Sequence, residues 1–369
     1  MSENFLRRQW ARFSWRGSSP ASAPSPSTPS ANELAYRERI ATETAVFADR
    51  VKVHDLPPIF HYWSNKHLRP LAESFGFSNP DDFFVRYLER AAGIKPQGAR
   101  FVSLGAGNCD LEVRLACSLK QRGVAGFFIE CVDINPAMLE RGRTLAREHG
   151  VAAEVVPRLG DFNSWRPEQS YDAVIANQSL HHVLELETLF DAIRGALAPG
   201  GVFLTADMIG RNGHLRWPEA LDIVREFWRE LPLSYRYNLQ LRRQEDEFLD
   251  WDCSGKSFEG IRAQDVLPLL IERFHFDMFL AFGNVIDPFV DRSFGHHFNA
   301  DAEWDRDFID RVHARDEAEI LAGRIKPTHV FAVMRTEPVA KTLCLRHLTP
   351  EFCVRAPPQG SDPHNRRLS

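Results

Sequence analysis

The chain lacks the cysteine spacings that hold metal ions or that staple small secreted domains. Six cysteines are scattered through 369 residues, and no two of them form a CxxC pair. This excludes a cysteine zinc site and gives no sign of a disulfide framework. We therefore expect a reducing, intracellular environment, in which most of these cysteines act as small core residues.

Long apolar runs are also missing from the sequence. The longest of them fall far short of the roughly 20 residues that a membrane-spanning helix requires. No apolar signal-peptide core follows the first residues. The sequence therefore predicts no integral membrane segment and a cytoplasmic location.

The sequence also has no excess of basic residues. Lysine and arginine number 45 against 50 aspartates and glutamates, for a formal net charge of -5 and a pI of about 6.3. A protein whose main partner is a nucleic-acid backbone needs a basic surface, so we expect no nucleic-acid partner. The hydrophobic fraction of 44% and the charged fraction of 26% are typical of a globular enzyme.

Composition divides the chain into a central region and two tails. Residues 17–32, "GSSPASAPSPSTPSAN", are mostly serine, proline and alanine without charge and cannot bury a core. The carboxyl end loses periodicity, and we expect disorder beyond about Arg355. The predicted parts are a disordered tail and linker (1–32), an N-terminal helical cap (33–97), the main domain (98–337) with a helical insert (211–262), and a mostly disordered tail (338–369).

Strand and helix patterns alternate through the main domain. Asn135 and Pro136 supply an N-cap and a first-turn proline for one helix, and Asp110 is the expected N-cap of another. Pro157 lies in a predicted strand and is tolerable only at a sheet edge. The alternation predicts an α/β fold with a doubly wound, mostly parallel sheet. The expected strands are 101–104, 127–133, 151–159, 172–177, 202–207, 278–282 and 328–334.

A glycine turn follows the first predicted strand in "FVSLGAGNCDLEV", residues 101–113. Gly105 and Gly107 permit close approach of a ligand, and the following helix aims its N-terminal N–H groups at it. Asp110 stands where a dinucleotide-binding loop has its third glycine, and a carboxylate there repels a pyrophosphate. The turn therefore suits a single nucleoside better than a dinucleotide.

Polar residues follow three further strands of the predicted sheet. Asp133 ends the second strand, where a carboxylate can accept both hydroxyls of a ribose. Asp161 and Phe162 follow the third strand, where they can contact an adenine. Asn177 and Gln178 follow the fourth strand, beside the glycine turn, in the usual ligand crevice of an open α/β sheet.

Five motifs in this order resemble the class I S-adenosylmethionine-dependent methyltransferases. They are "VSLGAGN", "CVDINPAMLERGR", "LGDFNSW", "YDAVIANQSLHHV" and "LAPGGVFLTADMIG", over roughly residues 98–210, and the late "THVFAVMR" is similar to that family's antiparallel strand. The resemblance implies a seven-stranded sheet of order 3-2-1-4-5-7-6 and S-adenosyl-L-methionine as cofactor. The cofactor-binding residues it implies are Gly105, Ala106, Gly107, Asp133, Ile134, Asp161, Phe162, Asn177 and Gln178.

The chain departs from the family pattern at two positions. Ser103 stands where the family often has an acidic residue, and Cys109 stands where it often has a third glycine. The first departure leaves open how the ammonium group of the cofactor is held. The second exchanges one small residue for another.

Histidines supply the candidate catalytic groups. Methyl transfer needs a base only if the acceptor is protonated, and His181 and His182 after the fourth strand are the candidates for that base. His214 is a further candidate, and capping or packing explains any of the three equally well. His296 and its neighbour lie in a polar stretch without other ligand spacing, so the sequence predicts no metal site.

The acceptor class is narrowed by missing motifs. The stretch "NQSL" after the fourth strand replaces the Asn/Asp-Pro-Pro-aromatic run of enzymes that methylate amino groups of DNA bases, and no acidic hairpin pair marks a protein-arginine enzyme. A small-molecule, lipid-like or glycan acceptor fits best, and the oligomeric state is left open. Two alternatives remain, a nicotinamide-dependent dehydrogenase and a non-catalytic cofactor-binding relative. The dehydrogenase is disfavoured because 28 residues separate Gly105 from Asp133, whereas the dinucleotide fingerprint has about 20.

Overall fold

The structure is a computed structural model that describes residues 31–48, 56–94, 98–255 and 257–355. The chain divides into two compact units between Glu38 and Arg39, and the account below concerns the second unit. The predicted linker up to residue 30 and the predicted tail from residue 356 lie outside the described residues.

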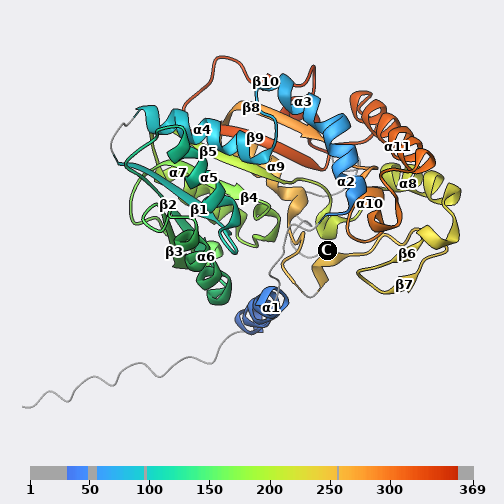
Figure 1. The fold of residues 1–369 in the computed structure, drawn as a ribbon, viewed down its shortest axis with the longest axis horizontal. Helices are drawn as coiled ribbons and strands as arrows, with labels where there is room; N and C mark the ends of the chain where they lie inside the picture. The colour runs from blue at the N-terminus through green and yellow to red at the C-terminus, as the bar shows by residue number, and fades with distance from the viewer. Residues whose placement is uncertain (1–30, 49–55, 95–97, 256, 356–369) are drawn as a thin grey trace, which may run out of the picture. The chain divides into compact units, whose positions relative to one another are not determined.

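An eight-stranded sheet organises the second unit (Figure 1). Its order is β10-β8-β9-β5-β4-β1-β2-β3, with β9 antiparallel to both of its neighbours and the other pairs parallel. The strands are β1 (Ala99–Leu104), β2 (Phe127–Asp133), β3 (Val155–Leu159), β4 (Tyr171–Asn177), β5 (Leu197–Met208), β8 (His275–Phe282), β9 (His329–Arg335) and β10 (Leu343–Cys344).

The α/β class and the mostly parallel sheet are confirmed, but the predicted number of strands was wrong. The seven predicted strands follow one another in the predicted order, and an eighth strand extends the sheet. Strand β10 adds an eighth strand outside β8, because Leu343 and Cys344 pair with Met278 and Phe279. A two-residue strand is too short to produce an alternating pattern, and this stretch was therefore predicted to belong to the carboxyl-terminal tail. The third strand also starts at Val155 and not at residue 151, and its Pro157 does lie on an edge strand, as expected.

Helices cover both faces of the sheet. Val102 and Leu104 belong to one hydrophobic cluster and Phe101 to the other, since successive side chains of a strand point to opposite faces. One cluster includes residues of α3 (Arg69–Ser74), α4 (Pro80–Ile94), α5 (Asp110–Gln121) and α6 (Pro136–Glu148). The other includes residues of α2 (Pro58–Trp63), α7 (Leu186–Ala196), α8 (Pro218–Glu230), α9 (Ala263–Arg273), α10 (Asp287–Val290), α11 (Glu303–Leu321) and α12 (Pro350–Cys353).

The insert after β5 is not purely helical. It contains α8, but Tyr237–Asn238 (β6) and Arg243–Gln244 (β7) form a small antiparallel hairpin. The prediction of a helical insert without strands was therefore wrong for this part, because each arm of the hairpin is only two residues long. The remaining helix of the described part before β1 is α1 (Ala31–Ala48), and η1 (Ser64–Leu68) joins α2 to α3.

The two helix starts nearest the glycine turn behave differently. Asn135 caps α6 as predicted, because its side-chain oxygen accepts from the backbone N–H groups of Ala137 and Met138. The N-cap of α5 is Cys109, in a left-handed conformation with φ 57°, and Asp110 is the first helical residue. The predicted cap at Asp110 was therefore one position too late.

No helix among the described ranges is both long enough and apolar enough to cross a membrane.

Candidate functional site

The glycine turn is anchored to the end of the neighbouring strand β2. The backbone N–H groups of Gly105 and Ala106 donate to Val132 O at 2.9 and 3.1 Å. Gly105 has a φ of 77°, and a Cβ added there would lie 2.6 Å from Cβ of Ser179. The turn therefore needs glycine at this position for its conformation and for close packing.

Asp133 holds the next residues of the turn. Its Oδ2 accepts from Gly107 N at 2.8 Å and its Oδ1 accepts from Asn135 N at 2.8 Å. Burial raises the pKa of this carboxyl although the two backbone N–H groups oppose that effect. Asp133 thus joins the end of β2 to the glycine turn, and Ile134 follows it as a half-buried residue.

The adenine candidates lie beside the same turn. A Cβ on Gly105 would lie 3.5 Å from Cε1 of Phe162, so the ring of Phe162 borders the turn. Asp161 accepts from Asn163 N at 2.9 Å and so caps the short helix η2 (Phe162–Ser164). The structure therefore brings Phe162 to Gly105, while one Asp161 oxygen caps a helix.

The residues after β4 meet the end of β1. Asn177 ends β4 and is half-buried. Gln178 is exposed with a left-handed φ of 52°, and its backbone N–H donates to Ala206 O at 2.8 Å. Ser179 Oγ donates to Leu104 O at 2.8 Å, which fixes this loop against the start of the glycine turn.

A buried carboxyl that the sequence did not single out lies under the turn. Ser103, which replaces the family's acidic residue, donates its hydroxyl to Glu112 Oε1 at 2.6 Å. Glu112 comes from α5, is 2% exposed, and its Oε2 has no partner among the described residues. Burial raises the pKa of Glu112 to about 7. The carboxyl group of Glu112 in α5 thus lies beside Ser103, the position in β1 where the family often has an acidic residue.

Glu112 should make the stability of the protein depend on pH. Its folded-state pKa of about 7 lies above the ordinary value of 4.5 for a glutamate. The stabilising effect of the protonated group is therefore present below the unfolded pKa and is lost as pH rises through 7. The loss amounts to at most about 3 kcal/mol. In Glu112→Gln, which mimics the protonated form, this part of the pH dependence should disappear. Urea unfolding at about pH 5 and about pH 8 measures it.

The comparison of variant with parent isolates Glu112 from other buried acids. Burial also raises the pKa of Asp316 to about 7, and this group keeps titrating in both proteins. Equal pH dependence of unfolding in Glu112→Gln and its parent would contradict the assignment.

His181 is tied to the end of β5 by a buried aspartate. Its Nδ1 lies 2.6 Å from Oδ1 of Asp207. Asp207 Oδ2 accepts from the backbone N–H groups of Ser179 and Leu180, both at 2.8 Å. Asp207 is 1% exposed and is the last but one residue of β5, where it pairs with Val330 of β9. Asp207 therefore sets both the loop after β4 and the orientation of the imidazole.

Three imidazole nitrogens converge on the carboxylate of Glu259. Its Oε1 lies 2.6 Å from Nε2 of His214 and 3.3 Å from Nε2 of His181. Its Oε2 lies 3.5 Å from Nε2 of His182. The other nitrogen of His182, Nδ1, lies 3.0 Å from Oε1 of Glu43 in α1. We call His181, His182, His214 and Glu259 the histidine cluster.

The charges of the histidine cluster are set by burial and by the carboxylates. Burial opposes protonation of His181, but Asp207 and Glu259 outweigh it and raise the pKa of His181 to about 10. Burial also opposes ionisation of Glu259, yet the histidines hold its pKa well below the usual range. Burial lowers the pKa of His214, with Glu259 only partly offsetting it. His181 is therefore an imidazolium between two carboxylates near neutral pH, and His214 is neutral.

Glycines bring the two loops of the cluster together. Gly213 N donates to Gly260 O at 2.8 Å, and a Cβ on Gly260 would lie 3.1 Å from the backbone nitrogens of Gly213 and His214. His214 itself has a φ of 56°, a conformation that costs a non-glycine residue roughly 1 kcal/mol or more. The surrounding structure thus holds His214 in a strained backbone conformation with its ring on Glu259.

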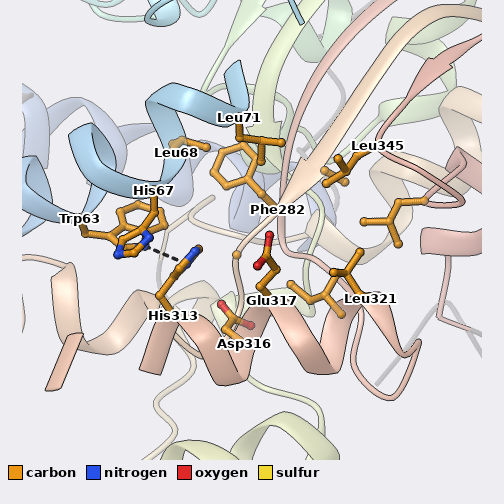
Figure 2. Close-up of a pocket in the computed structure, with 14 residues that line it drawn as sticks. Trp63, His67, Leu68, Leu71, Phe282, His313, Asp316, Glu317, Leu321 and Leu345 are labelled. Atoms are coloured by element: carbon orange, nitrogen blue, oxygen red, sulfur yellow. Dashed lines mark hydrogen bonds between the residues drawn. The ribbon is translucent and has the colours of Figure 1, made fainter. Parts of the chain in front are cut away.

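The side chains of Tyr62 and Trp63 in α2 make hydrogen bonds to α11 and not to the glycine turn. The Tyr62 hydroxyl donates to Asp310 of α11 at 2.9 Å, and Trp63 Nε1 donates to His313 Nδ1 at 3.3 Å. Figure 2 shows Trp63 and His313 at one end of a cavity of about 60 Å³. The residues that line it come from α2, η1, α3, β8, α11 and the segment after β10: Trp63, His67, Leu68, Leu71, Ala281, Phe282, Gly283, His313, Asp316, Glu317, Ile320, Leu321, Leu345 and Leu348. None of them belongs to the glycine turn or to the histidine cluster.

The sequence predicted part of this site and missed the rest. The structure brings Gly105, Gly107, Asp133 and Phe162 together. Ser179 contacts the same turn, and His181 follows it two residues later along the chain. Sequence reasoning missed Asp207 and Glu259. Asp207 had a recognisable signal, because it is an acid near the end of the mostly apolar strand β5. Glu259 lies in an irregular loop without any periodic pattern.

Residues 102–203 match a family described as a methyltransferase domain. The ubiquinone/menaquinone biosynthesis C-methyltransferase UbiE of Shewanella sp. (strain ANA-3) is 25% identical over 135 residues, which are 36% of this chain and 51% of the relative. The trans-aconitate 2-methyltransferase of Streptomyces coelicolor is 29% identical over 118 residues, which are 32% of this chain and 37% of the relative. The chain thus spans about half the length, or less, of these curated relatives.

Solved structures are also similar to this chain. The crystal structure of geranyl diphosphate C-methyltransferase from Streptomyces coelicolor aligns with 85% of this chain and 100% of its own, at 13% identity and a TM-score of 0.42. The matched segment begins in β1, contains the glycine turn and Asp133, and ends in β5. The resemblance to methyltransferases noted in the sequence is therefore confirmed for residues 102–203, which match a methyltransferase domain.

Proposed function

We propose that this protein transfers a methyl group from S-adenosyl-L-methionine to a small-molecule acceptor. The observation that carries the proposal is that the segment matching the methyltransferase family forms the glycine turn and ends β2 at Asp133. In this proposal Gly105, Ala106 and Gly107 border the methionine part, Asp133 and Ile134 the ribose, Asp161 and Phe162 the adenine, and Asn177 and Gln178 the sulfonium.

The chemistry asks the protein mainly for position and for exclusion of water. Methyl transfer from a sulfonium is an in-line displacement, which is accelerated when donor and acceptor are held close in a dry site. Phe162 is buried and borders the turn, so its ring helps to exclude water there. His182 is a candidate for the base that a hydroxyl acceptor requires. His181, which Asp207 orients, is also a candidate but must first lose its proton, because its pKa is raised to about 10.

The acceptor lies outside the matched segment in this proposal. The relatives carry names of enzymes that act on quinone precursors, trans-aconitate and sterols, which are small or lipid-like molecules. The net charge of -5 disfavours a nucleic-acid acceptor. We therefore propose a small-molecule, lipid-like or glycan acceptor, bound on the side where the segment after β5 approaches His181 and His182.

Replacing Asp133 tests the cofactor assignment. In Asp133→Ala the affinity for S-adenosylhomocysteine should fall at least about 10–100-fold, because a buried, charged hydrogen-bonding group is lost. Asp133→Asn keeps one accepting oxygen for the turn and should lose less. Isothermal titration calorimetry on both variants, with urea unfolding to confirm folding, measures the effect. Unchanged affinity in a folded Asp133→Ala would remove the ribose role.

Two further titrations separate the alternatives. NAD competing with S-adenosylhomocysteine for one site would support the dehydrogenase reading. Binding without turnover on a panel of metabolites and glycans, assayed with a labelled methyl donor, would support the non-catalytic relative.

A further inference from the structure

We propose that the histidine cluster binds one divalent transition-metal ion of the zinc and iron class. The proposal goes beyond methyl transfer and does not depend on it. It also replaces the sequence-based expectation that the chain has no metal site, because the ligands come from three separate stretches of chain.

Ligand atoms of the right kind converge in this place. His181, His214 and Glu259 each offer one such atom, and the three atoms all lie within 4.8 Å of one another. A tetrahedral zinc site with bonds of about 2.0–2.2 Å holds its ligand atoms roughly 3.4 Å apart. Small side-chain movements therefore bring the three atoms to bonding distance. Two histidines and one carboxylate are a ligand set typical of catalytic zinc and of non-haem iron.

The surroundings of His181 and His182 match what metal-bound histidines need. A ligating imidazole usually presents its second nitrogen to a carboxylate, which fixes the ring and its tautomer. Asp207 lies 2.6 Å from Nδ1 of His181, and Glu43 lies 3.0 Å from Nδ1 of His182. Both histidines are thus held with Nε2 directed at Glu259.

The site is preorganised on one side and open on another. The side chains of His181, His182 and His214 are 4%, 15% and 14% exposed, whereas that of Glu259 is 36% exposed. The hydrogen bond from Gly213 to Gly260 fixes the loops that carry His214 and Glu259. A cation bound here therefore keeps a coordination position accessible for water or for a small molecule.

Metal binding and the base role exclude each other for His181. One Nε2 lone pair cannot both coordinate a cation and accept a proton from the acceptor molecule. A bound cation would occupy the space between the imidazoles and Glu259 and would satisfy the same carboxylates that now surround the imidazolium.

Zinc titration of the tag-free, chelator-treated full chain tests the proposal. We expect one equivalent of Zn²⁺ to bind by calorimetry, and Co²⁺ to give visible absorption bands typical of nitrogen and oxygen ligands. Mg²⁺ in excess should not displace either, because it prefers all-oxygen sites. Binding of S-adenosylhomocysteine is measured separately, so failure of this proposal leaves the proposed function standing, and the reverse.

Matched variants locate the site. His214→Asn keeps a residue that tolerates a positive φ but removes the nitrogen ligand, and Glu259→Gln removes the anionic ligand. Each should weaken Zn²⁺ binding at least about 100-fold, since loss of a supporting partner alone costs about 10–100-fold. His296→Ala removes an exposed histidine outside the cluster and should bind Zn²⁺ as the parent does. The proposal is overturned if the parent binds no stoichiometric Zn²⁺, or if both cluster variants, shown to be folded by urea unfolding, bind it unchanged.

Discussion

Gly105→Ala should abolish measurable S-adenosylhomocysteine binding and destabilise the fold. The new Cβ would lie 2.6 Å from Cβ of Ser179, a contact that requires the loop after β4 to move. The φ of 77° at this position adds a penalty of about 1–2 kcal/mol for any residue with a side chain, and overpacking adds about 1–3 kcal/mol. Urea unfolding and calorimetry measure the two effects.

Gly123→Ala is the matched control for this prediction. Gly123 has a φ of 81°, but nothing lies within 4 Å of a Cβ added there. It therefore carries the backbone penalty without the contact. Gly107 is a weaker test, because its added Cβ would meet only the flexible end of Met138 at 3.1 Å. If Gly105→Ala loses no more stability than Gly123→Ala and still binds the ligand, the close-packing argument fails.

Asp207→Ala should lower the free energy of unfolding by about 3–5 kcal/mol, as expected when one partner of a buried ion pair is removed. Asp207 accepts from His181 and from three backbone N–H groups, those of Ser179, Leu180 and Met208. Its loss leaves these donors unsatisfied in the interior and removes the anion beside a buried imidazolium. Denaturant unfolding near neutral pH gives the difference directly.

Asp191→Ala provides the exposed counterpart. Asp191 pairs with Arg273 at 2.9 Å, but its side chain is 65% exposed, so its loss should cost about 0–1 kcal/mol. Asp207→Asn keeps the shape and one accepting oxygen, and it serves as the variant to measure if Asp207→Ala does not fold. A loss within about 1 kcal/mol for both Asp207 variants would show that the buried pair contributes little.

The sequence predicted the regular part of the fold because its signals are local. Phe127–Asp133 was predicted to the residue, since an apolar run ends there in an acid and a capping asparagine. Strand β10 and the hairpin β6–β7 escaped because their two-residue arms are defined by their partners and not by any pattern of their own.

The candidate site was likewise predictable only where its residues follow regular strands. Glycines and acids at the ends of strands give positions that a parallel sheet brings to one edge, so Gly105 and Asp133 could be paired in advance. The contact between His214 and Glu259 depends on two irregular loops that meet through Gly213 and Gly260. Such a contact between residues 45 positions apart has no signature in the sequence.

Asp207 lies just beyond the segment that matches the family, so the match does not include all the residues around the histidine pair. The family match ends at residue 203, yet Asp207, His214 and Glu259, which give His181 and His182 their surroundings, all follow it. The two histidines thus belong to the shared domain by position, while their chemical environment is supplied by sequence that the shared domain does not include. Changes in these later loops would therefore alter the surroundings of the histidine pair without any change in the glycine turn.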